Sequence, residues 1–136
     1  MKKKSNKKKI LIKKVEILDI ANKGKCIARD DNRVIIIKGG VPGDICDVII
    51  VKKKKKYWEG NIEKIHNYSK LRTEAECEHF NVCGGCKWQN MKYKSQLFFK
   101  QKEVINNLEK IGNVKLASYN DILGSQQKYY YRNKME

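Results

Sequence analysis

Short apolar runs separated by turn-forming residues fill the first half of the chain and predict a module of β-strands. The first run alternates loosely between apolar and polar residues, and a later one, Val34–Ile37, is apolar enough throughout for a buried strand. The predicted strands are, in chain order, Ile10–Ile20, Lys25–Arg29, Val34–Ile37, Ile45–Val51 and Tyr57–Ile65. Five strands in fewer than 60 residues favour a mainly β fold, a small closed barrel of the OB type spanning residues 10–67.

Turn-forming residues stand between these runs and set their order. Asn22–Gly24 and Asp30–Asn32 are turn signals, and Gly39–Asp44 is the sharpest break, with the only proline of the chain. Breaks of this kind join consecutive strands through short hairpins or loops.

In the second half of the chain, the spacing of the apolar residues changes from that of strands to that of a helix. After a connecting segment at residues 68–90, apolar residues recur at helical spacing, and Gly112 stands where a helix would end. The positions of this stripe are Leu97, Phe98, Val104, Ile105, Leu108 and Ile111. We therefore predict one amphipathic helix over residues 91–112, whose stripe packs against the connecting segment or another domain. Residues 113–136 are expected to begin a truncated α/β region.

The net charge of +16 is concentrated at the front of the chain. Residues 1–56 hold 18 basic and 6 acidic side chains, whereas residues 57–136 hold 13 and 9. Such a front half attracts polyanions by neutralising phosphates and releasing counterions, although a lysine surface that only solubilises the chain is the alternative. Residues 1–9 carry six lysines and are expected to form a disordered tail.

The apolar runs are too short to cross a bilayer, and the one after the lysine tail is too short for a signal peptide. We expect a cytoplasmic protein without membrane contact, and a monomer.

A second lysine run, Lys52–Lys56, ends at Tyr57 and Trp58 on a predicted hairpin. Cations followed by aromatic rings can combine phosphate contacts with base stacking, so we predict that these residues and Lys38 bind RNA. The alternative is a solvated hairpin whose Trp58 folds back onto the barrel.

Three of the five cysteines, Cys77, Cys83 and Cys86, fall within ten residues. Gly84 and Gly85 separate the last pair, which permits a tight turn that aims two sulfurs at one centre. Thiolates at this density are typical of a metal or iron–sulfur site. We predict that these three cysteines are metal ligands.

The fourth ligand is open on the residues alone. Cys26 and Cys46 lie on predicted strands and are expected to be small buried apolar residues. His79 could complete a Cys3His zinc site, as in a free-standing RNA-binding protein. Alternatively, the fourth ligand lies outside this sequence.

The segment from Gly24 through Val41–Asp44 and on to Ile65 resembles a TRAM domain, an RNA-binding barrel found in tRNA- and rRNA-modifying enzymes. Its most characteristic part is the Pro-Gly-acidic turn, followed by an apolar strand and a basic hairpin. The resemblance implies that residues 10–67 contact RNA.

From Ile10 onward the chain is similar to the 23S rRNA (uracil-5-)-methyltransferases, which use S-adenosylmethionine to make 5-methyluridine. The similarity is carried by the cysteine segment, residues 77–86, and by positions after it, which include Trp88, Gln89, Tyr93, Gln96, Leu97 and Lys100. It implies that Cys77, Cys83 and Cys86 are three of the four ligands of a [4Fe-4S] cluster, with a fourth cysteine beyond residue 136. The final residues resemble the family's Tyr-Arg-Asn-Lys segment.

That resemblance makes the chain an N-terminal region, with the donor site and catalytic domain outside it. No glycine-rich donor loop or cysteine in a catalytic setting is found here, so no catalytic residue is assigned, and we expect no methyl transfer by this chain alone. Radical methylthiotransferases also carry a TRAM barrel, but their Cys-x3-Cys-x2-Cys motif differs from the Cys-x5-Cys-x2-Cys spacing here.

Overall fold

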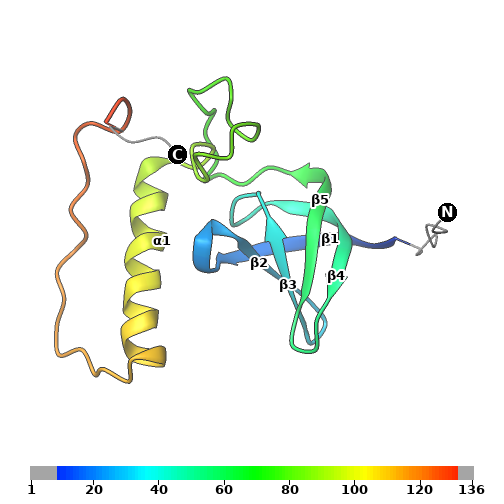
Figure 1. The fold of residues 1–136 in the computed structure, drawn as a ribbon, viewed down its shortest axis with the longest axis horizontal. Coiled ribbons are helices and arrows are strands. Elements are labelled where there is room, and N and C mark those ends of the chain that lie inside the picture. The colour runs from blue at the N-terminus through cyan, green and yellow to red at the C-terminus, as the bar shows by residue number, and fades with distance from the viewer. Residues whose placement is uncertain (1–8, 132–136) are drawn as a thin grey trace, which may run out of the picture. The chain divides into compact units, whose positions relative to one another are not determined.

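The computed structural model describes residues 9–131 and contains the predicted closed five-stranded barrel (Figure 1). The strands are β1 (Ile10–Ile20), β2 (Cys26–Asp30), β3 (Arg33–Lys38), β4 (Ile45–Lys53) and β5 (Trp58–Asn67). Around the barrel they follow the order β1-β2-β3-β5-β4, and β4 pairs with β1 to close it. β3 and β5 are parallel, and the other neighbours are antiparallel. The mainly β prediction is therefore confirmed.

The barrel interior is built from alternate residues of four strands, because successive side chains of a strand point to opposite faces. Its buried members are Val15, Ile17, Cys26, Ala28, Ile35, Ile37, Cys46, Val48 and Ile50. On β5 the inward position is Gly60, where an added Cβ would lie 2.4 Å from Val48 Cγ1. A glycine there lets β5 approach β4 closely at the centre of the barrel.

β1 bends at Lys14, a non-glycine residue with a φ of 52°, where its pairing with β4 shifts register. The Lys14 backbone N–H donates to Asp47 Oδ1 at 2.8 Å, and His66 Nε2 lies 2.8 Å from the same oxygen. The bond from Lys14, followed by that from His66, lowers the pKa of the Asp47 carboxyl. β4 thus supplies the carboxylate that holds the bend in β1.

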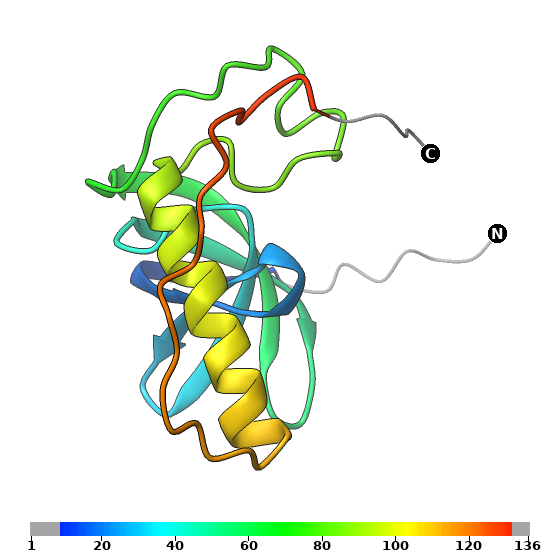
Figure 2. The ribbon, with the colours of Figure 1, turned by 90° about the vertical axis from the view of Figure 1, so that its left-hand side faces the viewer.

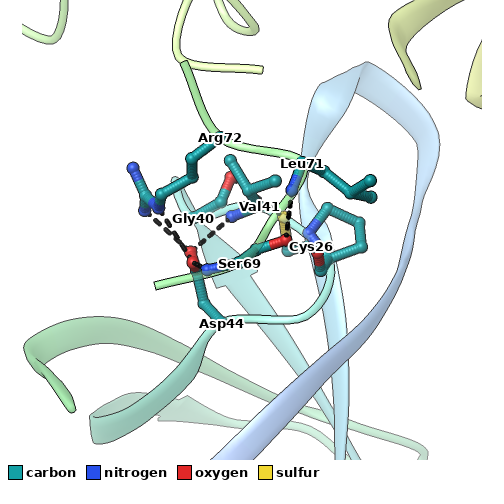
Figure 3. A network of polar contacts seen from close by, with 8 residues as sticks. Cys26, Gly40, Val41, Asp44, Ser69, Leu71 and Arg72 are labelled. Atoms are coloured by element: carbon teal, nitrogen blue, oxygen red, sulfur yellow. Dashed lines mark hydrogen bonds and ion pairs between the residues drawn. The ribbon is translucent and has the colours of Figure 1, made fainter. Parts of the chain in front are cut away.

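The turn before β4 contains a fully buried carboxylate, that of Asp44 (Figure 3). Its Oδ2 accepts the Val41 backbone N–H at 2.8 Å, and its Oδ1 accepts the Ser69 backbone N–H at 2.8 Å. Arg72 adds two bonds, from Nε to Oδ1 at 2.8 Å and from Nη2 to Oδ2 at 2.7 Å. The two-pronged arginine contact and the amide bonds together satisfy a charge that burial would otherwise penalise heavily.

The same turn is fastened to β1 and to the segment after β5. Gly43 donates its N–H to Ile17 O at 2.7 Å, and Ile17 donates to Asp44 O at 2.9 Å. Ser69 Oγ donates to Pro42 O at 2.6 Å and accepts the Leu71 N–H at 3.0 Å. A turn, a strand and a later connector therefore meet at Asp44.

The described residues from Gln96 onward form a second compact unit. It contains most of α1 (Tyr93–Asn106), which continues as a π-helical turn, Asn107–Ile111, and ends at Gly112 as predicted. The segment after Gly112 runs back along α1 (Figure 2) and is held there by the side-chain amide of Gln101, whose Oε1 accepts the Ile122 N–H at 2.9 Å.

The apolar stripe of the helix is largely exposed. Phe98, Val104 and Ile111 are 61%, 56% and 74% exposed, and Phe99, which is not part of the stripe, is the residue of α1 that is buried. The predicted packing of the stripe stays a prediction. Among residues 9–131 there is no helix with the length and apolarity that crossing a membrane requires. The predicted lysine tail lies outside the described residues except for Lys9, as do the last five residues of the region expected at 113–136.

Replacing Asp44 by alanine should lower the free energy of unfolding by about 3–5 kcal/mol, because the variant leaves the Arg72 charge and two amides without their acceptor. Denaturant unfolding followed by circular dichroism measures this loss. The double variant Asp44→Ala/Arg72→Met should recover part of it, since no unpaired charge then remains.

The matched control is Asp30→Ala. Asp30 Oδ2 lies 3.8 Å from Arg33 Nη1 in an exposed ion pair, so its loss should cost no more than about 1 kcal/mol. Equal destabilisation by the two alanine substitutions would contradict the role given to Asp44.

Candidate RNA-binding surface and cysteine loop

The lysines of the hairpin between β4 and β5 lie at one end of the barrel. Because β3 and β5 are parallel, with Ile35 opposite Trp58, the turn before β3 and the turn before β5 lie at the same end. Figure 1 shows both turns at the lower end of the barrel. The exposed lysines of the β4–β5 turn thus stand beside Arg33, which opens β3.

Lys54 differs from the other hairpin lysines because its charge is already paired. Its Nζ donates to Tyr57 Oη at 2.7 Å and lies 3.0 Å from Glu59 Oε1. These bonds, with Tyr57 as the larger influence, raise the pKa of Lys54, and the bond from Lys54 lowers the pKa of Glu59. Lys54 therefore shapes the hairpin, while Lys55 and Lys56 at its tip face solvent.

Trp58 is half-buried and packs against the barrel core. Two cations also lie over its ring, Arg33 with Cζ at 3.8 Å from the centroid and Lys53 with Nζ at 4.4 Å. The structure thus matches the alternative in which Trp58 folds back onto the barrel, with cations as its outer contacts.

Lys38 does not join this group. It ends β3, five residues after Arg33 and opposite Asn61, which places it about 17 Å along the strand from the hairpin end. The structure therefore brings Lys52–Lys56, Tyr57 and Trp58 together and leaves Lys38 at the other end, exposed to solvent.

The cysteine loop, residues 72–91, leaves the barrel at that other end, and backbone contacts close it at its base. Arg72 pairs with Met91 in an isolated bridge, Thr73 N–H donates to Asn90 O at 3.0 Å, and Lys92 N–H donates to Leu71 O at 2.8 Å. Met91 is fully buried. The arginine that binds Asp44 is thus also the residue that closes the loop.

A second attachment ties the loop to the turn between β1 and β2. Lys87 Nζ donates to Lys23 O at 2.9 Å, and a Cβ added at Gly24 would lie 2.9 Å from Trp88 Nε1. The φ of Gly24 is +69°, a backbone conformation that a larger residue would find strained, so glycine suits this close approach on both counts.

Within the loop, short turns position the three predicted ligands. Phe80 N–H donates to Cys77 O at 3.0 Å, and Cys83 N–H donates to His79 O at 2.9 Å. Cys77 N–H donates to the side chain of Gln89 at 3.1 Å, and Gly84 has a φ of 75°. The chain around the cysteines is thus folded into turns rather than extended.

Cys77, Cys83 and Cys86 are all exposed free thiols, a donor set that suits a thiolate-bound cluster. In the described part of the chain, however, no three His, Cys, Asp or Glu side chains converge as a metal site would require. The three ligands therefore stay a prediction.

Cys26 and Cys46 belong to the barrel core, as expected. Burial raises the pKa of the Cys26 thiol to about 12 and that of Cys46 to about 11. Both thiols lie inside the packed barrel, whereas the three cysteines of the loop are exposed.

Sequence reasoning missed Arg33, Arg72 and the role of Asp44. The acidic residue after Pro-Gly was visible as part of the TRAM-like turn, but its partner stands 28 residues later. Arg33 stood between the predicted turn and the predicted strand Val34–Ile37, and the parallel pairing of β3 with β5 brings it over Trp58.

Comparison with known proteins identifies one domain and several relatives of this chain. Residues 11–62 match the TRAM domain. The chain is 43% identical over 122 residues to an uncharacterized RNA methyltransferase of Porphyromonas gingivalis, an alignment that covers 90% of this chain and 26% of that protein. A protein of the same description from Bacteroides thetaiotaomicron is 44% identical over 117 residues, covering 86% of the chain and 26% of the relative. One from Bacillus cereus is 34% identical over 118 residues, covering 87% and 26%.

The chain thus spans about a quarter of the length of these curated relatives. The residues that match the TRAM domain, 11–62, run from β1 into β5 and so cover most of the barrel. The chain thus contains a TRAM domain and is 34–44% identical, over most of its length, to proteins described as RNA methyltransferases, which is consistent with the TRAM-containing RNA methyltransferase family.

Proposed function

We propose that this chain is the RNA-binding and cluster-binding region of an S-adenosylmethionine-dependent RNA uracil-C5 methyltransferase that acts on rRNA. The observation that carries the RNA-binding part is the TRAM barrel with one strongly cationic end. Surface charge of this kind supplies sequence-independent affinity for a phosphate backbone. The uracil and rRNA parts rest on the resemblance of the cysteine segment.

In this proposal the barrel collects RNA and the cysteine loop has an architectural role. Cys77, Cys83 and Cys86 would hold a [4Fe-4S] cluster, with a fourth ligand from elsewhere than the barrel core. The cluster would supply a rigid multi-thiolate junction, which fits a loop whose base is already fixed by Arg72 and Met91. Donor binding and methyl transfer to uracil would belong to a catalytic domain outside residues 1–136.

Removing the two charges at the hairpin tip should weaken RNA binding and make the binding constant less sensitive to salt concentration. The variant Lys55→Gln/Lys56→Gln is expected to lower the slope of log K against log salt by up to about 1.4, since each single-strand phosphate contact contributes about 0.7. Fluorescence anisotropy of a labelled single-stranded RNA at several salt concentrations measures it. Lys54 is left intact because its charge is paired.

The matched control for this variant is Lys64→Gln/Lys70→Gln, which removes the same charge from exposed lysines on and after the far end of β5. Identical slopes for the two double variants would remove the hairpin tip from the RNA interface. Absence of RNA binding by the unaltered chain would overturn the function.

Anaerobic reconstitution with iron, sulfide and excess dithiothreitol should give brown protein with broad visible absorption, the small thiol standing in for the fourth ligand. Cys83→Ser should lose the colour, and His79→Ala should keep it. Colourless protein that holds one zinc ion, and loses it on His79→Ala, would instead favour the Cys3His alternative.

Deletion of the gene that encodes this sequence should remove 5-methyluridine from one position of rRNA. Nuclease digestion and mass spectrometry of the RNA fragments measure the change, and the intact gene supplied in trans should restore it. Loss of a different methylated nucleotide, with 5-methyluridine unchanged, would reject uracil as the target while leaving RNA binding by the barrel untouched.

A further inference from the structure

Trp58 and the two cations over it form a structural unit at the hairpin end of the barrel. The guanidinium carbon of Arg33 and the ammonium of Lys53 lie 3.8 and 4.4 Å from the same ring centroid. The two charges are therefore no more than about 8 Å apart, close enough to repel each other and to share an anion.

The barrel topology holds this unit together from three strands. Lys53 ends β4 directly opposite Trp58 at the start of β5, and Ile35 of β3 is the other neighbour of Trp58. Arg33 lies two residues before Ile35 on the same strand. The backbone positions of both cations are thus fixed by sheet hydrogen bonds.

Within the described part of the chain, acidic side chains do little to neutralise these two charges. The carboxylate near Arg33 is Asp30, at 3.8 Å in an exposed contact, which contributes little. Within residues 9–131 no carboxylate lies at ion-pair distance from Lys53, whereas Glu59 is taken by Lys54. Two like charges are therefore held against one aromatic ring, and no carboxylate of residues 9–131 makes a close ion pair with both.

We propose that Arg33 and Lys53, braced on the ring of Trp58, form a binding site for backbone phosphate of single-stranded RNA. The ring serves as a support for the cations and not as a stacking surface for a base. Stacking on the indole restricts the long side chains before RNA arrives, so less conformational entropy is lost when a phosphate binds. This inference rests on the proposed RNA binding.

The first test distinguishes a contribution of this site from the effect of removing any surface charge. Arg33→Gln and Lys53→Gln should each weaken binding of labelled oligouridylate and lower its salt slope by about 0.7. Lys64→Gln removes the same charge from the far end of β5, about 20 Å from Trp58 along the strand, and should leave the slope unchanged. Equal effects of all three substitutions would overturn the inference while RNA binding by the unaltered chain still stands.

The second test distinguishes a support from a stacking surface. Inorganic polyphosphate offers phosphates and no bases, so Trp58→Leu should weaken binding of polyphosphate and of oligouridylate by similar factors. If Trp58 stacks on a base, oligouridylate alone would bind more weakly, and the inference would fail. Circular dichroism checks the fold, and if the leucine variant is unfolded, Trp58→Phe provides the same comparison with a smaller expected loss because Phe attracts cations less than Trp does.

Discussion

A single buried carboxylate organises the end of the barrel from which the cysteine loop emerges. Asp44 is fully buried and accepts bonds from Val41, Ser69 and Arg72. Because an unpaired carboxylate at this depth would be very costly, the turn, the connector and the base of the loop must all be in place together. The position of the loop on the barrel follows from that requirement.

The cations and the cysteines therefore lie at opposite ends of the barrel. Cations and Trp58 lie at the end where β3 and β5 begin, and the loop with its exposed thiols lies at the end where they finish. Ten residues of β5 join the two ends, a distance of about 30 Å along the strand. RNA contacts on the hairpin therefore need not approach the cysteines, and the proposed cluster and the phosphate site can be altered independently.

Sequence patterns predicted the five strands, the helix end at Gly112 and the burial of Cys26 and Cys46, because each depends on local periodicity or composition. Pairings between distant residues carried no such signal. The contact of Asp44 with Arg72 and that of Arg33 with Trp58 arise only when the barrel closes, and the placement of Lys38 away from the hairpin follows from strand direction. The apolar stripe on α1 is present in the sequence, but the spacing of its residues carries no information about what packs against it.

The separation of Asp44 from its counterion also bears on the order of folding during synthesis. The ribosome delivers the carboxylate 28 residues before the arginine that neutralises it, and β5, which bridges β3 and β4, emerges in between. A nascent chain that ends at residue 67 contains all five strands but still lacks the arginine that neutralises the buried charge. The Asp44 site is therefore completed after the last strand has been synthesised, in line with the late formation of non-local contacts.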